Sequence, residues 1–142
     1  MPEPASGWRH FPHQADVGLS GFGPTMEDAF EQTALAMTAV VTEPSAVRPT
    51  TEVAIRCIAP DRELLLIEWL NALIYEMATR QMLFASFDVH IDGERLDATA
   101  KGERISRERH EPAVEIKGAT YTALSVRHGD DGLWTTTCVV DV

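Results

Sequence analysis

The sequence predicts an α+β fold in which two helices pack on a mostly antiparallel sheet built from hairpins. Two segments, 26–41 and 61–77, place apolar residues at helical spacing, whereas the chain beyond residue 86 alternates apolar and polar residues as strands do. Turn sequences at Asp92-Gly93 and at 129–132 separate successive strands. Helices followed by a run of hairpins are typical of an α+β layer fold.

The first half of the chain supplies both helices. A short strand is expected at 16–22, with Val17 and Leu19 on one face. Thr25 is a suitable N-cap for the first helix, with an acidic residue three positions later as in a capping box, and Pro44 marks the limit of that helix.

A second strand and a second helix follow. The strand at 51–58 alternates clearly, and Asp61 is a suitable N-cap for the helix after it. This helix is apolar around most of its circumference, so we expect it to lie deep in the domain rather than on its surface.

The rest of the chain is expected to be β, apart from one charged stretch. That stretch, 101–111, carries nearly balanced charges and is interpreted as a solvated loop, with His110 on the surface. The expected strands are 87–91, 96–100, 114–121, 124–127 and 133–140.

Length and composition favour one acidic domain. The chain has 142 residues and a formal net charge of −10, which speaks against a nucleic-acid binder because phosphate contacts need clustered Lys and Arg. We expect a flexible tail at 1–7 and a single domain at 8–142. No apolar run is long enough for a membrane span, and Cys57 and Cys138 are expected to be buried reduced thiols, as in a cytoplasmic protein.

The closing residues suggest a site for a hard cation. Asp141 and Val142 bring a side-chain carboxylate, a backbone carbonyl and the α-carboxylate within one residue of each other. If Val17 and Val140 face the core, strand parity directs Asp16 and Asp141 away from it, and the two acids could meet if their strands pair. Such oxygen donors suit Ca²⁺, Mg²⁺ or Mn²⁺. The alternative is that both aspartates are solvated strand ends.

Other candidate residues each have a structural alternative. His13 lies in the loop that leads to Asp16. Glu68 and Asn71 share one face of the apolar helix, where polar side chains more often satisfy backbone groups than catalyse. Lys117 could contact a partner or a phosphate, or only solvent. Phosphate-binding glycine loops and nucleophile motifs are missing from the sequence, so we do not expect a stand-alone enzyme.

From His10 to the end, the chain resembles the archease family. The motifs that carry the resemblance are His13-Gln14-Ala15-Asp16-Val17-Gly18, Pro24-Thr25-Met26-Glu27-Asp28-Ala29-Phe30, Glu68-Trp69-Leu70-Asn71 with Leu83-Phe84, Arg109-His110-Glu111, Lys117-Gly118-Ala119-Thr120-Tyr121 and Val139-Val140-Asp141-Val142. Each is short, but their occurrence in this order is specific to that family.

The resemblance implies both a partner and a metal. Archeases assist the RtcB-type tRNA-splicing RNA ligase by promoting transfer of GMP from GTP to the active-site histidine of the ligase, which allows multiple turnover. By the same resemblance, Asp16, Asp141 and the backbone oxygen of Val142 match the family's metal ligands, usually calcium, and Lys117 and His13 are expected at the ligase interface. Direct contact with nucleic acid or a membrane is not expected.

The chain departs from the family pattern at three places. Gln14 stands where the family usually has Thr, and Thr122 where it commonly has His. The family also often has an Asp-Thr pair near the position of Ala78-Thr79. Two other functions stay open: a general chaperone in which the metal is structural, and, third, a metal-dependent hydrolase using the same carboxylates.

Overall fold

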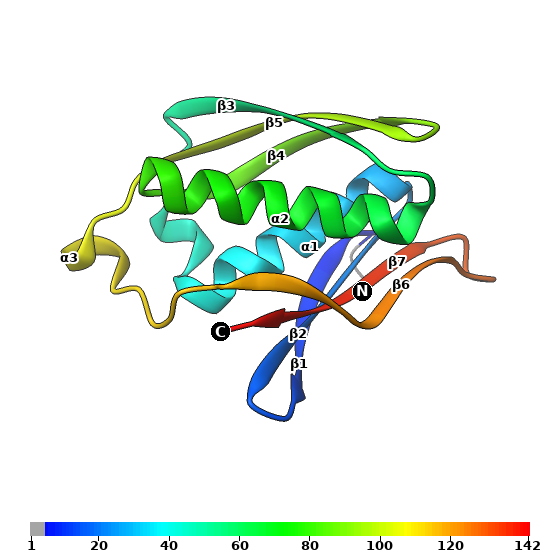
Figure 1. Ribbon diagram of the computed structural model, residues 1–142, viewed down its shortest axis with the longest axis horizontal. Coiled ribbons are helices and arrows are strands. Elements are labelled where there is room, and N and C mark those ends of the chain that lie inside the picture. Colours follow the sequence, from blue (N-terminus) through cyan, green and yellow to red (C-terminus); the bar gives the residue numbers. More distant parts are fainter. Residues whose placement is uncertain (1–4) are drawn as a thin grey trace.

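The computed structural model describes residues 5–142 and consists of two antiparallel sheets with a layer of two helices between them (Figure 1). The α+β class and the two long helices predicted from the sequence are confirmed, but the strands form two sheets rather than one. The elements are β1 (Gly7–His13), β2 (Asp16–Gly23), α1 (Met26–Val41), a 3₁₀ turn (Pro44–Ala46), β3 (Thr51–Ile58), α2 (Arg62–Arg80), β4 (Met82–Asp92), β5 (Arg95–Arg104), α3 (Arg107–His110), β6 (Gly118–His128) and β7 (Trp134–Asp141).

Both long helices begin at the predicted caps. The Thr25 hydroxyl accepts a hydrogen bond from the Asp28 backbone N–H, and the Asp28 side chain accepts one from the Thr25 N–H, which completes a capping box. Asp61 accepts a hydrogen bond from the Leu64 N–H at the start of α2. The buried residues of α2, from Leu65 to Ile74, pack against the two sheets. Glu68, Asn71 and Tyr75 are exposed, so the helix keeps one solvent-facing side and is not as deeply buried as predicted.

The sheet that contains both chain ends has the strand order β1-β2-β7-β6. It packs closely on α1 at Gly21, where an added Cβ would overlap the backbone and hydroxyl of Thr33. The Thr33 hydroxyl also forms a hydrogen bond with Thr136 of β7. This contact fixes β2 and β7 side by side beneath α1.

The second sheet has the order β3-β5-β4. Its β4–β5 hairpin turns tightly after Asp92, with Gly93 at φ +61°, and pairing resumes at Arg95, as the sequence predicts. Strands β4 and β5 are longer than expected, because β4 begins directly after α2.

The expected tail and first loop differ from the structure. Residues 1–4 of the expected tail lie outside the described residues, whereas Gly7 begins β1 and pairs with Phe22. His13 is therefore the last residue of β1 and not part of a loop. Strand β1 was not predicted.

The charged stretch 101–111 is not a solvated loop. Its first part continues β5 to Arg104, and α3 follows after two residues. His110 is buried, and both of its ring nitrogens have hydrogen-bond partners. Its Nε2–H donates to Glu103 at 3.0 Å, and its Nδ1 accepts from the Ser106 N–H at 2.8 Å. Arg109 also donates to Glu103, so the balanced charges form a compact hydrogen-bonded network rather than separate solvated side chains.

Residues 111–117 are irregular, so the strand expected to begin at residue 114 starts only at Gly118, as β6. The segment crosses the end of the helical layer, where the Ala113 N–H donates to the Val41 carbonyl and Ile116 is buried. The Ala113 N–H therefore has a partner on α1, and only the end of the segment, at Lys117, reaches the backbone of β7.

Candidate metal centre

The predicted acids lie in one row at the end of the β1-β2-β7-β6 sheet. Strand β2 pairs with β7 up to Val17 and Val140, so Asp16 and Asp141 occupy the next opposed positions of the same register. His13 pairs with Asp16 on one side, and Gly118 pairs with Asp141 on the other. We call these four residues, His13, Asp16, Asp141 and Gly118, the sheet-end row.

The alternation of side chains along β2 and β7 places the two carboxylates on the face of the sheet away from the helices. Leu19 and Cys138 are paired and fully buried, and Val17 and Val140 pack against the same core. Since side chains alternate along a strand, Asp16 and Asp141 project on the opposite face. Asp16 is partly buried and Asp141 is exposed. Pairing of the two strands, which the sequence could not establish, is thus observed.

The backbone around Asp141 limits which oxygens remain free. The Lys117 N–H donates to the Asp141 carbonyl at 2.8 Å, so that carbonyl is already engaged. The chain end lies beside the start of β6 (Figure 1), and Val142 packs partly against the core. The remaining donors are the carboxylates of Asp16 and Asp141 and the backbone oxygen of Val142.

An apolar surface borders the acid pair. Phe11 and Gly18 form a cross-strand pair two residues from the His13–Asp16 pair, on the same face of the sheet. A Cβ added at Gly18 would overlap the Phe11 ring. Val139, which faces Gly18 on the other side, is only 1% exposed. Gly18 is therefore required for the ring to lie flat across the sheet, next to Asp16 and Asp141. Sequence reasoning missed this feature, because residues 8–12, Trp-Arg-His-Phe-Pro, do not alternate apolar and polar residues as a half-buried strand does.

The acid pair fits a hard divalent cation on chemical grounds. Like charges on directly opposed strand residues repel, and a cation between them removes that repulsion. Carboxylate and backbone oxygens are ligands of Ca²⁺ and Mg²⁺, with water filling further positions. Among residues 5–142 there is no cluster of three or more His, Cys, Asp or Glu side chains suited to a metal, so His13 shares the row without completing such a cluster.

The other predicted residues have structural partners. Asn71 of α2 accepts a hydrogen bond from the Ala119 N–H at 2.9 Å, which ties α2 to β6. Glu68 is exposed on the same helix face, and the Lys117 side chain is exposed at the edge of the sheet-end row. Both cysteines are free and buried as predicted, and burial raises the pKa of each thiol to about 11. They are therefore protonated at neutral pH.

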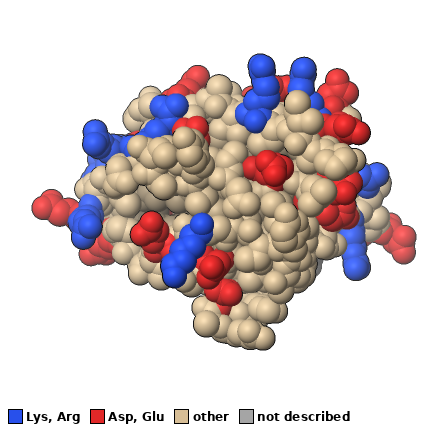
Figure 2. Space-filling model, in the orientation of Figure 1, with Lys and Arg blue, Asp and Glu red and all other residues tan. Residues whose placement is uncertain are grey.

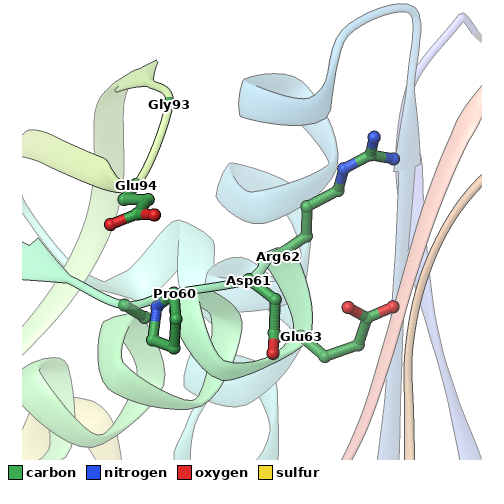
Figure 3. Close-up of a pocket in the computed structure, with 7 residues that line it drawn as sticks. Pro60, Asp61, Arg62, Glu63, Gly93 and Glu94 are labelled. Carbon is green, nitrogen blue, oxygen red and sulfur yellow. The ribbon is translucent and has the colours of Figure 1, made fainter.

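A second acidic hollow lies at the start of α2 (Figure 3). Its acids are Asp61, Glu63 and Glu94. Asp61 caps the helix, and the Arg62 side chain extends away from Glu94, with its guanidinium over the Trp134 ring at 5.1 Å. Helix capping accounts for Asp61, and the cation–π contact accounts for the position of Arg62.

The fold and the sheet-end row together define a small α+β protein with two opposed carboxylates at a sheet end. The chain belongs to the archease family, since residues 8–142 match the Archease protein family. The archease of Pyrococcus furiosus is 35% identical over 139 residues, covering 95% of this chain and 98% of the relative. The archease of Methanosarcina mazei is 33% identical and both chains are covered completely.

Two solved structures share the fold of this chain. The solution structure of protein 1598 from Methanobacterium thermoautotrophicum has a TM-score of 0.83 and 34% identity, covering 96% of this chain and 99% of that one. The crystal structure of a Thermotoga maritima protein, described as an archease and possible chaperone, has a TM-score of 0.61 at 19% identity, covering 100% and 98%. The second likeness concerns the fold alone. None of the described helices is both long and apolar enough to cross a membrane.

Proposed function

We propose that this protein is a cytoplasmic, metal-binding accessory protein that activates an RtcB-type tRNA-splicing RNA ligase. Membership of the archease family supports the class of function. The observation that carries the metal-binding part is the register of β2 and β7, which opposes Asp16 and Asp141 at the sheet end.

In this proposal Asp16, Asp141 and the backbone oxygen of Val142 hold one divalent cation, with Ca²⁺ preferred and Mg²⁺ or Mn²⁺ as alternatives. When bound, the cation supplies positive charge of the kind that stabilises phosphoryl groups in transfer. The Phe11 ring lies over Gly18, in the next pair of residues on the same face of the sheet. His13 and Lys117, which neighbour the acids in the sheet-end row, are proposed to contact the partner.

The assisted reaction is guanylylation of the ligase. A nitrogen of the ligase's active-site histidine forms a bond to the α-phosphorus of GTP while the bond from that phosphorus to the β-phosphate oxygen breaks, releasing pyrophosphate. The protein supplies no nucleophile in this step. The two thiols are protonated, and the buried His110 is engaged through both ring nitrogens, which supports an accessory role.

The proposal is tested with purified ligase at limiting concentration, GTP, Mn²⁺ and a cleaved RNA substrate. With this protein present, guanylylated ligase should accumulate and each ligase molecule should complete many ligations. Unchanged guanylylation and turnover, with a ligase shown to be active, would remove the activator function.

A general chaperone is the second candidate, favoured by the description of the Thermotoga maritima protein as a possible chaperone. In that case the protein should suppress aggregation of several unrelated unfolded proteins, and Asp16→Asn should leave this suppression intact. The ligase assay separates the two candidates, because a general chaperone has no reason to raise guanylylation of a stable, folded ligase.

A further inference from the structure

Strand β6 contains a large bulge in its middle. Thr120 pairs with Val139 and Ser125 pairs with Thr137, so the four residues from Tyr121 to Leu124 stand opposite the single residue Cys138. Figure 1 shows the bend that this produces in the orange strand. Bulges redirect side chains and are frequent beside functional sites.

The bulge includes a strained residue. Ala123 has φ +54°, a left-handed conformation that costs a residue with a Cβ about 1 kcal/mol or more. The other described non-glycine residues with positive φ have a local reason for it: Gln14 forms the β1–β2 turn, and Gln81 and Glu111 end helices. Ala123 alone among them lies inside a strand.

Several hydrogen bonds hold the base of the bulge. The Thr120 hydroxyl donates to the Val139 carbonyl at 2.9 Å and accepts from the Thr122 N–H at 3.3 Å. The Cys138 thiol donates to the Thr120 carbonyl at 3.3 Å. The bulge is therefore a built element of β6 and not a frayed edge.

The bulge presents an aromatic side chain to solvent. Tyr121 is 71% exposed, and Thr122 and Ala123 are exposed beside it. A second exposed tyrosine, Tyr75 at 65%, lies one turn beyond Asn71, the α2 residue that binds the Ala119 backbone. Near the centre of this face Figure 2 shows a single acidic group surrounded by uncharged residues, although the chain has a net charge of −10. Glu68 is the exposed acid on this face of α2.

The bulge is also close to the sheet-end row. Gly118, the β6 member of that row, precedes Tyr121 by three residues, a distance of about 10 Å along a strand. The bulge lies on the edge strand of the sheet, so one protein interface of ordinary size can reach both the bulge and the sheet-end row. Exposed tyrosines on a surface with few charges are typical of the energetic centre of protein interfaces.

We propose that the β6 bulge is the docking element for the partner protein, with Tyr121 inserted into an apolar pocket on the partner beside the metal-facing surface. The inference rests on the proposed function, and the partner is the RNA ligase. Cationic groups on the partner around this pocket would complement the acids of the sheet-end row and the net negative charge of the chain.

The test measures binding of purified ligase to the wild type, Tyr121→Ala, Tyr121→Phe and Ile58→Ala. Ile58 is the matched control, since it is 68% exposed but lies on β3 of the other sheet. Tyr121→Ala should weaken binding about tenfold or more, Tyr121→Phe should retain most of it, and Ile58→Ala should remain within about twofold of wild type. Thermal stability and Ca²⁺ affinity should be unchanged in all three.

A deletion variant tests the bulge itself. Removing residues 121–123 places Leu124 opposite Cys138 and restores a regular ladder, so the variant should fold and keep its metal affinity while ligase binding is lost. If the deletion variant or Tyr121→Ala binds ligase as tightly as wild type, the inference is wrong. A deletion variant that binds ligase normally but self-associates would assign the bulge to protection of the sheet edge instead.

Binding and activation of the ligase by the wild type distinguish failure of the proposed function from failure of the docking proposal. If the wild type binds no ligase, the proposed function fails and the docking proposal fails with it. If the wild type binds and activates while the Tyr121 variants do so equally well, only the docking proposal is overturned.

Discussion

Asp16 and Asp141 stand opposite each other at the first position beyond the Val17–Val140 pair, on neighbouring strands of one sheet. Their side chains share the face of that sheet that points away from the helices. Two like charges in this arrangement destabilise the metal-free fold, and a bound divalent cation reverses that effect. The stability of the protein should therefore report directly on the occupancy of this position.

The first prediction concerns the two acids. Asp16→Asn and Asp141→Asn should each leave the metal-free protein as stable as wild type or more stable, by up to about 1 kcal/mol, because the repulsion is removed. Ca²⁺ should raise the Tm of the wild type, and both variants should lose this rise, which is checked by thermal melts with Ca²⁺ and with EDTA. Asp88→Asn, on the outer face of β4, is the control and should keep the Ca²⁺ response. Normal Ca²⁺ stabilisation in both site variants would show that the metal binds elsewhere.

The second prediction concerns Gly18 and Phe11. Gly18→Ala should destabilise the protein by about 1–3 kcal/mol, because the new Cβ overlaps the Phe11 ring. In a Phe11→Ala background the same change should cost much less, since the ring is gone, and a double-mutant cycle from urea unfolding measures the difference. Equal costs of Gly18→Ala in both backgrounds would mean that the ring does not govern this position.

The third prediction concerns acid stability. Hydrogen bonds from Arg109 and from the Arg48 backbone lower the pKa of Glu103 from its ordinary 4.5 to about 2. Because the folded pKa lies below the unfolded one, Glu103 contributes its stabilisation above pH 4.5 and loses it as the pH falls towards 2. Urea unfolding at pH 7, 4.5 and 3 should show this loss.

Glu103→Gln is the control for that experiment. It should be less stable than wild type at pH 7, because the charged hydrogen bonds to Arg109 are weakened. The stability gap between the two proteins should narrow as the pH falls from 4.5. A gap that stays constant over this range would exclude Glu103 as a source of the acid sensitivity.

The fourth prediction concerns the thiols. Cys57 and Cys138 are buried and their pKa values are raised to about 11, so the native protein should react with a disulfide reagent at pH 7.5 only as fast as it unfolds. Two thiols should react rapidly once the protein is denatured in urea. Rapid labelling of either cysteine in the native state would mean that its strand opens locally.

The helices and the central hairpin could be predicted because their signals are local. Thr25 and Asp61 are capping residues directly before periodic apolar segments, and Asp92-Gly93 is a turn sequence between alternating strands. The division into two sheets could not be predicted, because it depends on which faces of α1 and α2 each hairpin covers. Strand β1 was missed because it follows the Pro-rich opening and its residues, Gly7–His13, show no apolar–polar alternation.

The acids of the site were identified from strand parity and from the family resemblance, but the contact between their strands is a long-range pairing with no local signature. The same holds for His110. Its position in a charged stretch favours a surface location for the side chain. Only the fold shows that Glu103 and Ser106 are hydrogen-bond partners of its two ring nitrogens, and that Arg109 pairs with Glu103. Tyr121 was known as part of a motif, whereas its bulge depends on the register of β6 against β7.

The most direct measurement is the number of ligations completed per molecule of ligase, with limiting ligase, GTP and Mn²⁺, and either wild type, Asp16→Asn, Asp141→Asn or Asp88→Asn added. Wild type and Asp88→Asn should give many ligations per ligase with accumulation of the guanylylated enzyme, and the two site variants should give about the level seen without any added protein. Full stimulation by Asp16→Asn and Asp141→Asn would show that the opposed carboxylates, and any metal they hold, have no part in activation.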